Sequence, residues 1–99
     1  MTHDDSRKAA EGRTNELIAL LRQQPNSAEL EPLIDECVAL SRAIGAFHME
    51  GIRFRMFNVD RKISRGGLIL PVEAAGIFAD ARHHLELAGF QTRSHQAPG

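Results

Sequence analysis

Residues 28–65 read AELEPLIDECVALSRAIGAFHMEGIRFRMFNVDRKISR, and this stretch decides the fold. Apolar residues recur through it at helical spacing, and only Gly45 and Gly51 interrupt them, each at a cost of about 1 kcal/mol. Pro32 is tolerated only in a first turn, and the next strong breaker is Gly66-Gly67. The pattern therefore predicts one helix over about 28–65, roughly 55 Å long at the standard rise per residue.

Shorter helices are predicted on both sides of this stretch. Residues 6–24 show helical spacing of apolar residues that ends before Pro25, and residues 71–89 show it again after Pro71. The only β-like segment has no credible pairing partner. The expected fold class is all-α with three helices, one long central helix (about 28–65) flanked by two shorter ones.

Length and composition bound the domain organisation and the class of protein. A chain of 99 residues has room for one core, and a lack of Trp and Tyr beside many Leu, Ile and Ala residues favours helices. We expect a single helical domain over residues 7–90. The polar segments 1–6 and 91–99 are expected to be disordered tails.

Several classes of partner and location are not indicated by the sequence. A formal net charge of −1 gives no overall attraction to nucleic acid or anionic lipid. No apolar run approaches the roughly 18 residues of a membrane span, and the N-terminal stretch is too polar for a signal peptide. The only cysteine, Cys37, cannot form an intramolecular disulfide. We therefore expect a soluble, cytoplasmic protein.

Two neighbouring apolar stripes run along the predicted long helix. They consist of Leu33, Cys37, Leu40, Ile44, Phe47 and Phe54, and of Ile34, Val38, Ile52, Met56, Val59 and Ile63. Together they cover about half of the helix circumference, which requires at least two packing partners along most of its length. Two flanking helices of roughly 25 Å each would leave one side exposed. The pattern therefore favours closure by a second copy, as a homodimer.

Charge is divided along the same helix. Acidic residues occupy its first part (Glu29, Glu31, Asp35, Glu36), and basic residues dominate its last part (Arg53, Arg55, Arg61, Lys62, Arg65). An antiparallel pair would set acid against base, and the small residues Ala43, Gly45 and Ala46 would let two backbones approach. We therefore expect an antiparallel dimer that crosses near residue 46. The alternative is that this order of charges only complements the helix dipole.

A row of polar residues lies on the centre line of the apolar arc. Ser41, His48 and Arg55 are seven residues apart, and Lys62 continues the row. One interpretation is a polar pocket inside the bundle, with His48 as ligand or proton acceptor and Arg55 as an anion clamp. The other is that these residues fix helix register, at some cost in stability.

Cys37 and His84 could join such a pocket. The apolar neighbours of Cys37 predict a buried, unreactive thiol, and Ser41 has no base within a helical turn, so neither indicates an enzyme. No His-x-x-x-His or Glu-x-x-His pair occurs, and adjacent His83 and His84 point about 100° apart on a helix. We expect no metal and no cofactor.

Bases and aromatics alternate over residues 52–57, as they do on many nucleic-acid surfaces. The acidic block on the same helix argues against a nucleic-acid partner. The predicted function is therefore that of a non-enzymatic helical bundle that acts through self-association and protein–protein interaction. The alternative is a small-molecule or metal-binding bundle with a site around His48, which requires a cavity there with converging polar groups.

Overall fold

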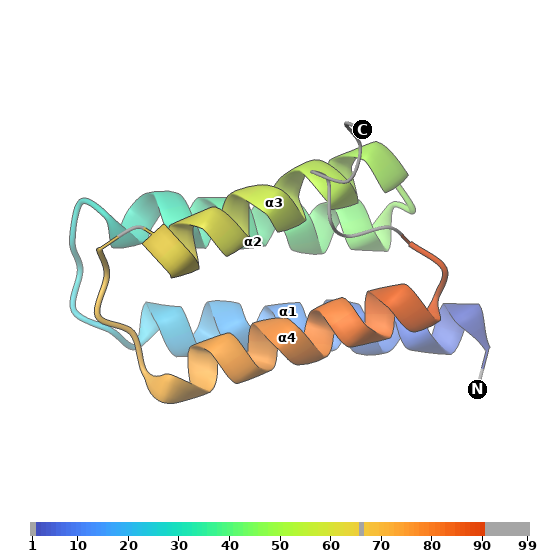
Figure 1. The fold of residues 1–99 in the computed structure, drawn as a ribbon, viewed down its shortest axis with the longest axis horizontal. Helices are drawn as coiled ribbons and strands as arrows, with labels where there is room; N and C mark the ends of the chain where they lie inside the picture. Colours follow the sequence, from blue (N-terminus) through green and yellow to red (C-terminus); the bar gives the residue numbers. More distant parts are fainter. Residues whose placement is uncertain (1, 66, 91–99) are drawn as a thin grey trace.

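The computed structural model describes residues 2–65 and 67–90, and over these residues the chain forms four helices and no strand. They are α1 (His3–Arg22), α2 (Leu30–Gly45), α3 (Met49–Arg65) and α4 (Val72–Leu87). Figure 1 shows two layers, with α1 beside α4 in one and α2 beside α3 in the other. The all-α class is confirmed, whereas the prediction of three helices is wrong.

The predicted long helix is broken at residues 46–48, where the chain reverses direction. The backbone N–H of His48 donates to Ala43 O at 3.0 Å, and that of Phe47 donates to Ile44 O at 3.2 Å. This is the Schellman pattern that ends many helices, and it places Phe47 at a φ of 59°. Such a left-handed conformation costs a residue with a side chain about 1 kcal/mol, which is why glycine is usual there.

His48 then begins α3 by capping it. Its imidazole Nδ1 accepts the backbone N–H of Gly51 at 2.9 Å, as the side chain of an N-cap residue does. A Cβ on Gly51 would lie 2.5 Å from this nitrogen, so glycine makes the close approach of the ring possible. Neither Phe47 nor His48 belongs to the residue types that usually mark helix ends, and the sequence therefore reads as uninterrupted helix.

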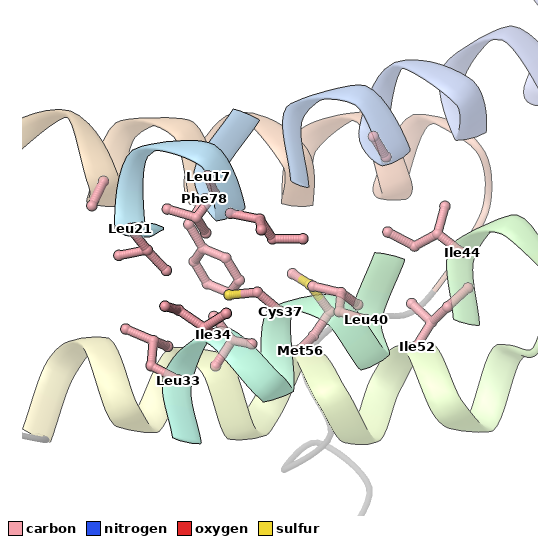
Figure 2. Packing of buried hydrophobic residues seen from close by; sticks show 14 of the residues in the cluster. Leu17, Leu21, Leu33, Ile34, Cys37, Leu40, Ile44, Ile52, Met56 and Phe78 are labelled. Carbon is pink, nitrogen blue, oxygen red and sulfur yellow. The ribbon is translucent and has the colours of Figure 1, made fainter. Parts of the chain in front are cut away.

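The reversal lets one chain cover its own apolar arc. In Figure 2, side chains from both layers meet between them, with Leu33, Ile34, Cys37 and Met56 of α2 and α3 on one side and Leu17, Leu21 and Phe78 of α1 and α4 on the other. α1 packs against both α2 and α4, and α2 also packs against α3. A second copy is therefore not needed to cover the arc.

The second apolar stripe lies in the core or, at Val38 and Ile63, half-buried against it, whereas the first stripe is buried only before the turn. Of the second stripe, Ile34, Ile52, Met56 and Val59 are buried. In the first stripe Phe47 and Phe54 are more than half exposed, at 57% and 56%. The turn shifts the rotational phase of α3 relative to α2, so residues on either side of it do not share the face that a continuous helix would give them.

The chain ends differ in what the structure says about them. α1 starts at His3 behind a capping box. In it, Thr2 Oγ1 accepts the backbone N–H of Asp5, and Asp5 Oδ2 accepts the backbone N–H of Thr2. Residues 3–6 are thus helical rather than a disordered tail, because the box satisfies the first backbone donors. The predicted tail at 91–99 lies outside the described residues. Over the described residues no helix combines the length and apolar content needed to cross a membrane.

Candidate functional site

The polar row predicted for one helix face is distributed over three places. Ser41 on α2 donates its hydroxyl hydrogen to Asn15 Oδ1 of α1 at 2.7 Å. His48 is an exposed residue in the turn, and Arg55 on α3 donates to Glu36 Oε1 of α2 at 3.1 Å. None of the three is buried, because the turn removes the common face that their spacing of seven requires.

Cys37 and His84 do not join the other candidates. Cys37 is fully buried in the core, as its apolar neighbours predict, and burial raises the pKa of its thiol to about 12. A thiol in this environment is a poor nucleophile. His84 lies on α4, with Nε2 3.6 Å from Asp80 Oδ2. Its contact is local to the α1–α4 layer, where Arg13 Nε donates to the same Asp80 oxygen at 2.7 Å.

His48 and Arg55 do meet at a groove on the outer side of α2 and α3. The hollow has a volume of about 760 Å³. Small residues form part of its lining, namely Ala39, Ala43, Ala46 and Gly51, and the larger residues Arg42, His48, Glu50, Phe54 and Arg55 complete it. We call this surface the α2–α3 groove.

The larger side chains of the α2–α3 groove combine an apolar ring with charge. Phe54 is 56% exposed, and the Arg55 guanidinium carbon lies 5.0 Å from the centre of its ring. Glu50 pairs with Arg53 at 3.3 Å. His48 Nδ1 is occupied by Gly51. The imidazole of His48 and the carboxylate of Glu50 thus make their contacts within the first turn of α3. The open apolar lining of the groove suits binding rather than catalysis.

A second hollow, of about 370 Å³, lies along α3 toward its C-terminal end. Its lining includes Arg61, Lys62 and Arg65 together with Glu36 and Asn58. Glu36 accepts hydrogen bonds from Arg55 at 3.1 Å and from Asn58 at 3.2 Å. The hairpin that α2 and α3 form therefore sets the acidic part of the predicted long helix against its basic part within one chain. The sequence predicted this arrangement between two chains.

Sequence reasoning missed Arg7, which anchors the turn beside the groove. Arg7 is buried, with 8% of the residue exposed, and its Nη1 donates to Ile44 O at 3.2 Å. Its Nη2 donates to Asp4 Oδ1 at 2.8 Å, and its guanidinium carbon lies 4.3 Å from the centre of the Phe47 ring. No local pattern could have revealed this role, because Ile44 is 37 residues away along the chain.

The structure offers no ready metal centre in residues 2–65 and 67–90, where no group of three or more His, Cys, Asp or Glu side chains could hold an ion. Comparison with known proteins adds no assignment. The chain matches no known protein family, no curated protein and no solved structure at a significant level.

Proposed function

We propose that this protein is a non-enzymatic interaction protein that binds a helix of a partner protein in its α2–α3 groove. The observation that carries the proposal is an open groove in which small side chains lie beside the exposed ring of Phe54. Self-association is the second part of the proposal.

The shape of the groove supports a helical partner. Helices approach most closely where their contact residues are small, and Ala39, Ala43 and Gly51 provide such a surface between two helices. An exposed aromatic ring beside it supplies a large apolar contact of the kind that dominates many interfaces. A partner helix would cover Phe54 and fill the groove with its own apolar side chains.

The charges at the groove indicate the chemistry of that partner. Arg42 is exposed, and among the described residues it has no carboxylate partner, while Arg55 lies at the same groove. α3 carries five arginines and lysines against two acidic residues. Complementary charge favours encounter with the correct partner and fixes its register. We therefore propose a partner helix with small apolar residues on one face and Asp or Glu along its edge.

The alternative, a small-molecule or metal-binding site around His48, has less support. It requires several polar groups that converge in a cavity, but Ser41 faces Asn15 and Cys37 is in the core. His48 and Arg55 are the two candidates that share a hollow, and each already has a partner within the chain. No specific observation favours this alternative.

Photo-crosslinking from the groove tests the proposed docking surface. Phe54 is replaced by p-benzoylphenylalanine, and the protein is irradiated in the cells from which it comes. We expect a covalent adduct with a second protein. The crosslinked peptide should come from an acidic amphipathic helix of that protein. Ala43→Glu, which places a carboxylate in the groove, should remove the adduct while circular dichroism remains helical.

The same probe at Ile69 is the matched control, because Ile69 is 98% exposed and belongs to the segment before α4, whereas the groove lies beside the α2–α3 turn. Adducts that are equally frequent from both positions, or that persist in Ala43→Glu, would contradict the proposal. An adduct made only of two copies of this chain would show that the groove binds a second copy instead.

A further inference from the structure

The turn between α2 and α3 joins two helices that belong to one amphipathic pattern. It consists of Ala46, Phe47 and His48, and Phe47 has a φ of 59°. The end of α4 uses the same backbone pattern, but there glycine takes the left-handed position, with a φ of 93° at Gly89. The α2–α3 turn is therefore formed by a residue that prefers another conformation.

A helical conformation at residues 46–48 would relieve Phe47 and fuse α2 and α3 into one helix over 30–65. Neighbouring Ala46, Met49 and Glu50 are good helix formers, and the whole stretch shows helical spacing of its apolar residues. In that straight form α3 points away from α2 of its own chain. The apolar faces of both helices then need another source of cover.

We propose that a second copy provides this cover by exchange of half-chains, which gives a swapped dimer. In this dimer α3 and α4 of each copy pack on α1 and α2 of the other, and the two straight helices run antiparallel with residues 46–48 at their crossing. This inference rests on the self-association part of the proposed function and specifies its geometry. Domain exchange of this kind is a low-cost route to dimers, because it reuses contacts that the monomer already makes.

The contacts to be reused connect the two halves of the chain. α1 packs on α4, and α2 packs on α3, so each of these interfaces joins a first-half helix to a second-half helix. Arg55 of α3 pairs with Glu36 of α2 at 3.1 Å, and Asp80 of α4 pairs with Arg13 of α1 at 2.7 Å. The same pairs would form between copies. The division of charge along residues 30–65 thus fits the hairpin and the antiparallel dimer equally well.

The turn itself holds the contacts that only the monomer makes. Phe47 lies with its ring centre 6.3 Å from that of Phe90 and 4.3 Å from the Arg7 guanidinium carbon. His48 caps α3 through the Gly51 N–H. The dimer gives up these contacts and gains helical backbone at residues 46–48. Its fraction should rise with protein concentration, and exchange should be slow because both core layers must separate.

Proline at the first position of α3 tests the inference. Met49→Pro is compatible with the hairpin, because a first-turn proline needs no backbone donor, but it would break the straight helix. Wild-type protein and variant are partly unfolded in denaturant at high concentration, refolded, and analysed by light scattering after size exclusion. We expect a dimer fraction from the wild type and only monomer from Met49→Pro, with equal helicity by circular dichroism.

Phe47→Ala and Phe47→Gly form a second, matched pair. Both lose the ring contacts, but alanine favours the straight helix and glycine favours the left-handed turn. We expect the dimer-to-monomer ratio of Phe47→Ala to exceed that of Phe47→Gly by roughly tenfold or more. Equal ratios in this pair, equal dimerisation of Met49→Pro and wild type, or a wild type that stays monomeric would each overturn the inference.

These outcomes are separate from those of the groove experiment. Crosslinking from Phe54 reports on the outer side of the hairpin and needs no change in the turn. A monomeric wild type that still crosslinks to a partner helix would reject the swapped dimer and retain the groove. A swapped dimer without groove adducts would do the reverse.

Discussion

Gly51 and His48 show how one missing side chain starts a helix. The His48 imidazole can cap α3 because Gly51 has no Cβ in the space that the ring occupies. Glycine usually weakens a helix, but here its cost is offset by a hydrogen bond to a backbone donor that would otherwise lack a helical partner. The pair explains why a residue type that rarely caps helices does so in this chain.

Gly51→Ala should therefore destabilise the protein, although alanine is the better helix former. The new Cβ would lie 2.5 Å from His48 Nδ1 and displace the ring, so we expect a loss of about 1 kcal/mol in the free energy of unfolding. Urea denaturation measures it. The control is Gly12→Ala in α1, where a Cβ meets nothing within 4 Å and a gain of about 0.5–1 kcal/mol is expected. Stabilisation by both variants would contradict this account.

Asp4 makes stability depend on pH at the acidic end. The hydrogen bond from the Arg7 guanidinium lowers the pKa of Asp4 below its usual value, although half of this side chain is exposed. A lowered folded-state pKa contributes stability that is present above the unfolded-state pKa and is lost as pH falls through the folded-state pKa.

Asp4→Asn should thus be less stable than the wild type at neutral pH, and the difference should vanish at pH values below the lowered pKa. Urea denaturation across the acidic range measures both free energies of unfolding. Glu73→Gln, an exposed carboxylate in the first turn of α4, is the control and should show a smaller difference. A difference for Asp4→Asn that does not change with pH would contradict the prediction.

At the scale of elements, Arg7 connects the first turns of α1 to the last turn of α2. Its hydrogen bond to Ile44 O adds a second donor, beside the Phe47 N–H, to a carbonyl at a helix end, where a cation also complements the helix dipole. Phe47 packs over the same guanidinium. The α2–α3 turn is thus held from outside by α1 as well as by its own backbone bonds.

Replacement of Arg7 by Met should lower the free energy of unfolding by about 2 kcal/mol, the scale of a buried hydrogen bond to a charged group. Met retains much of the apolar stem, so most of the loss reports on the guanidinium. Lys8→Met is the control, because Lys8 is 67% exposed and pairs with Asp4 only at the surface. Equal effects of the two variants, measured by chemical denaturation, would contradict an anchoring role for Arg7.

At the scale of the whole molecule, α1 and α2 are the central elements, and α3 and α4 are the peripheral ones. α1 packs on α2 and α4, whereas the close packing of α3 is with α2. Between α3 and α4, Arg82 lies 3.6 Å from Asp60, a contact made by long side chains. Arg82 Nε is also buried without a hydrogen-bond partner among the described residues. The described residues thus show no close packing between α3 and α4 of the kind that joins α3 to α2.

Hydrogen exchange should follow this difference in packing. We expect amides in the middle of α3 to exchange faster than those in the middle of α1, because local opening requires less free energy where fewer buried contacts hold a helix. Exchange monitored by mass spectrometry of peptides from each helix measures it. Protection of α3 equal to that of α1 would show that the four helices open as one unit and would contradict the prediction.

The candidate site was only partly predictable from sequence. Spacing identified His48 and Arg55 as unusual polar residues within an apolar pattern, and both line the groove. Their assumed relation to Ser41 was wrong, because it required one continuous helix. Arg7 and the exposed position of Phe54 were beyond local reasoning, since both depend on which helix faces which after the chain reverses.

The sequence alone established the helical class of the described residues, the residues of α2 whose apolar side chains face inward, and a separation of acidic from basic residues along 30–65 that favoured their pairing. These properties follow from periodicity and charge order, which are local. Only the tertiary structure decided that the pairing occurs within one chain. Whether the chain stays helical or reverses direction at residues 46–48 depends on how α1 and α4 pack over the apolar faces of α2 and α3. It also depends on the contacts of Arg7 with Ile44 and Phe47. Those contacts join residues far apart in sequence, and no local pattern records them.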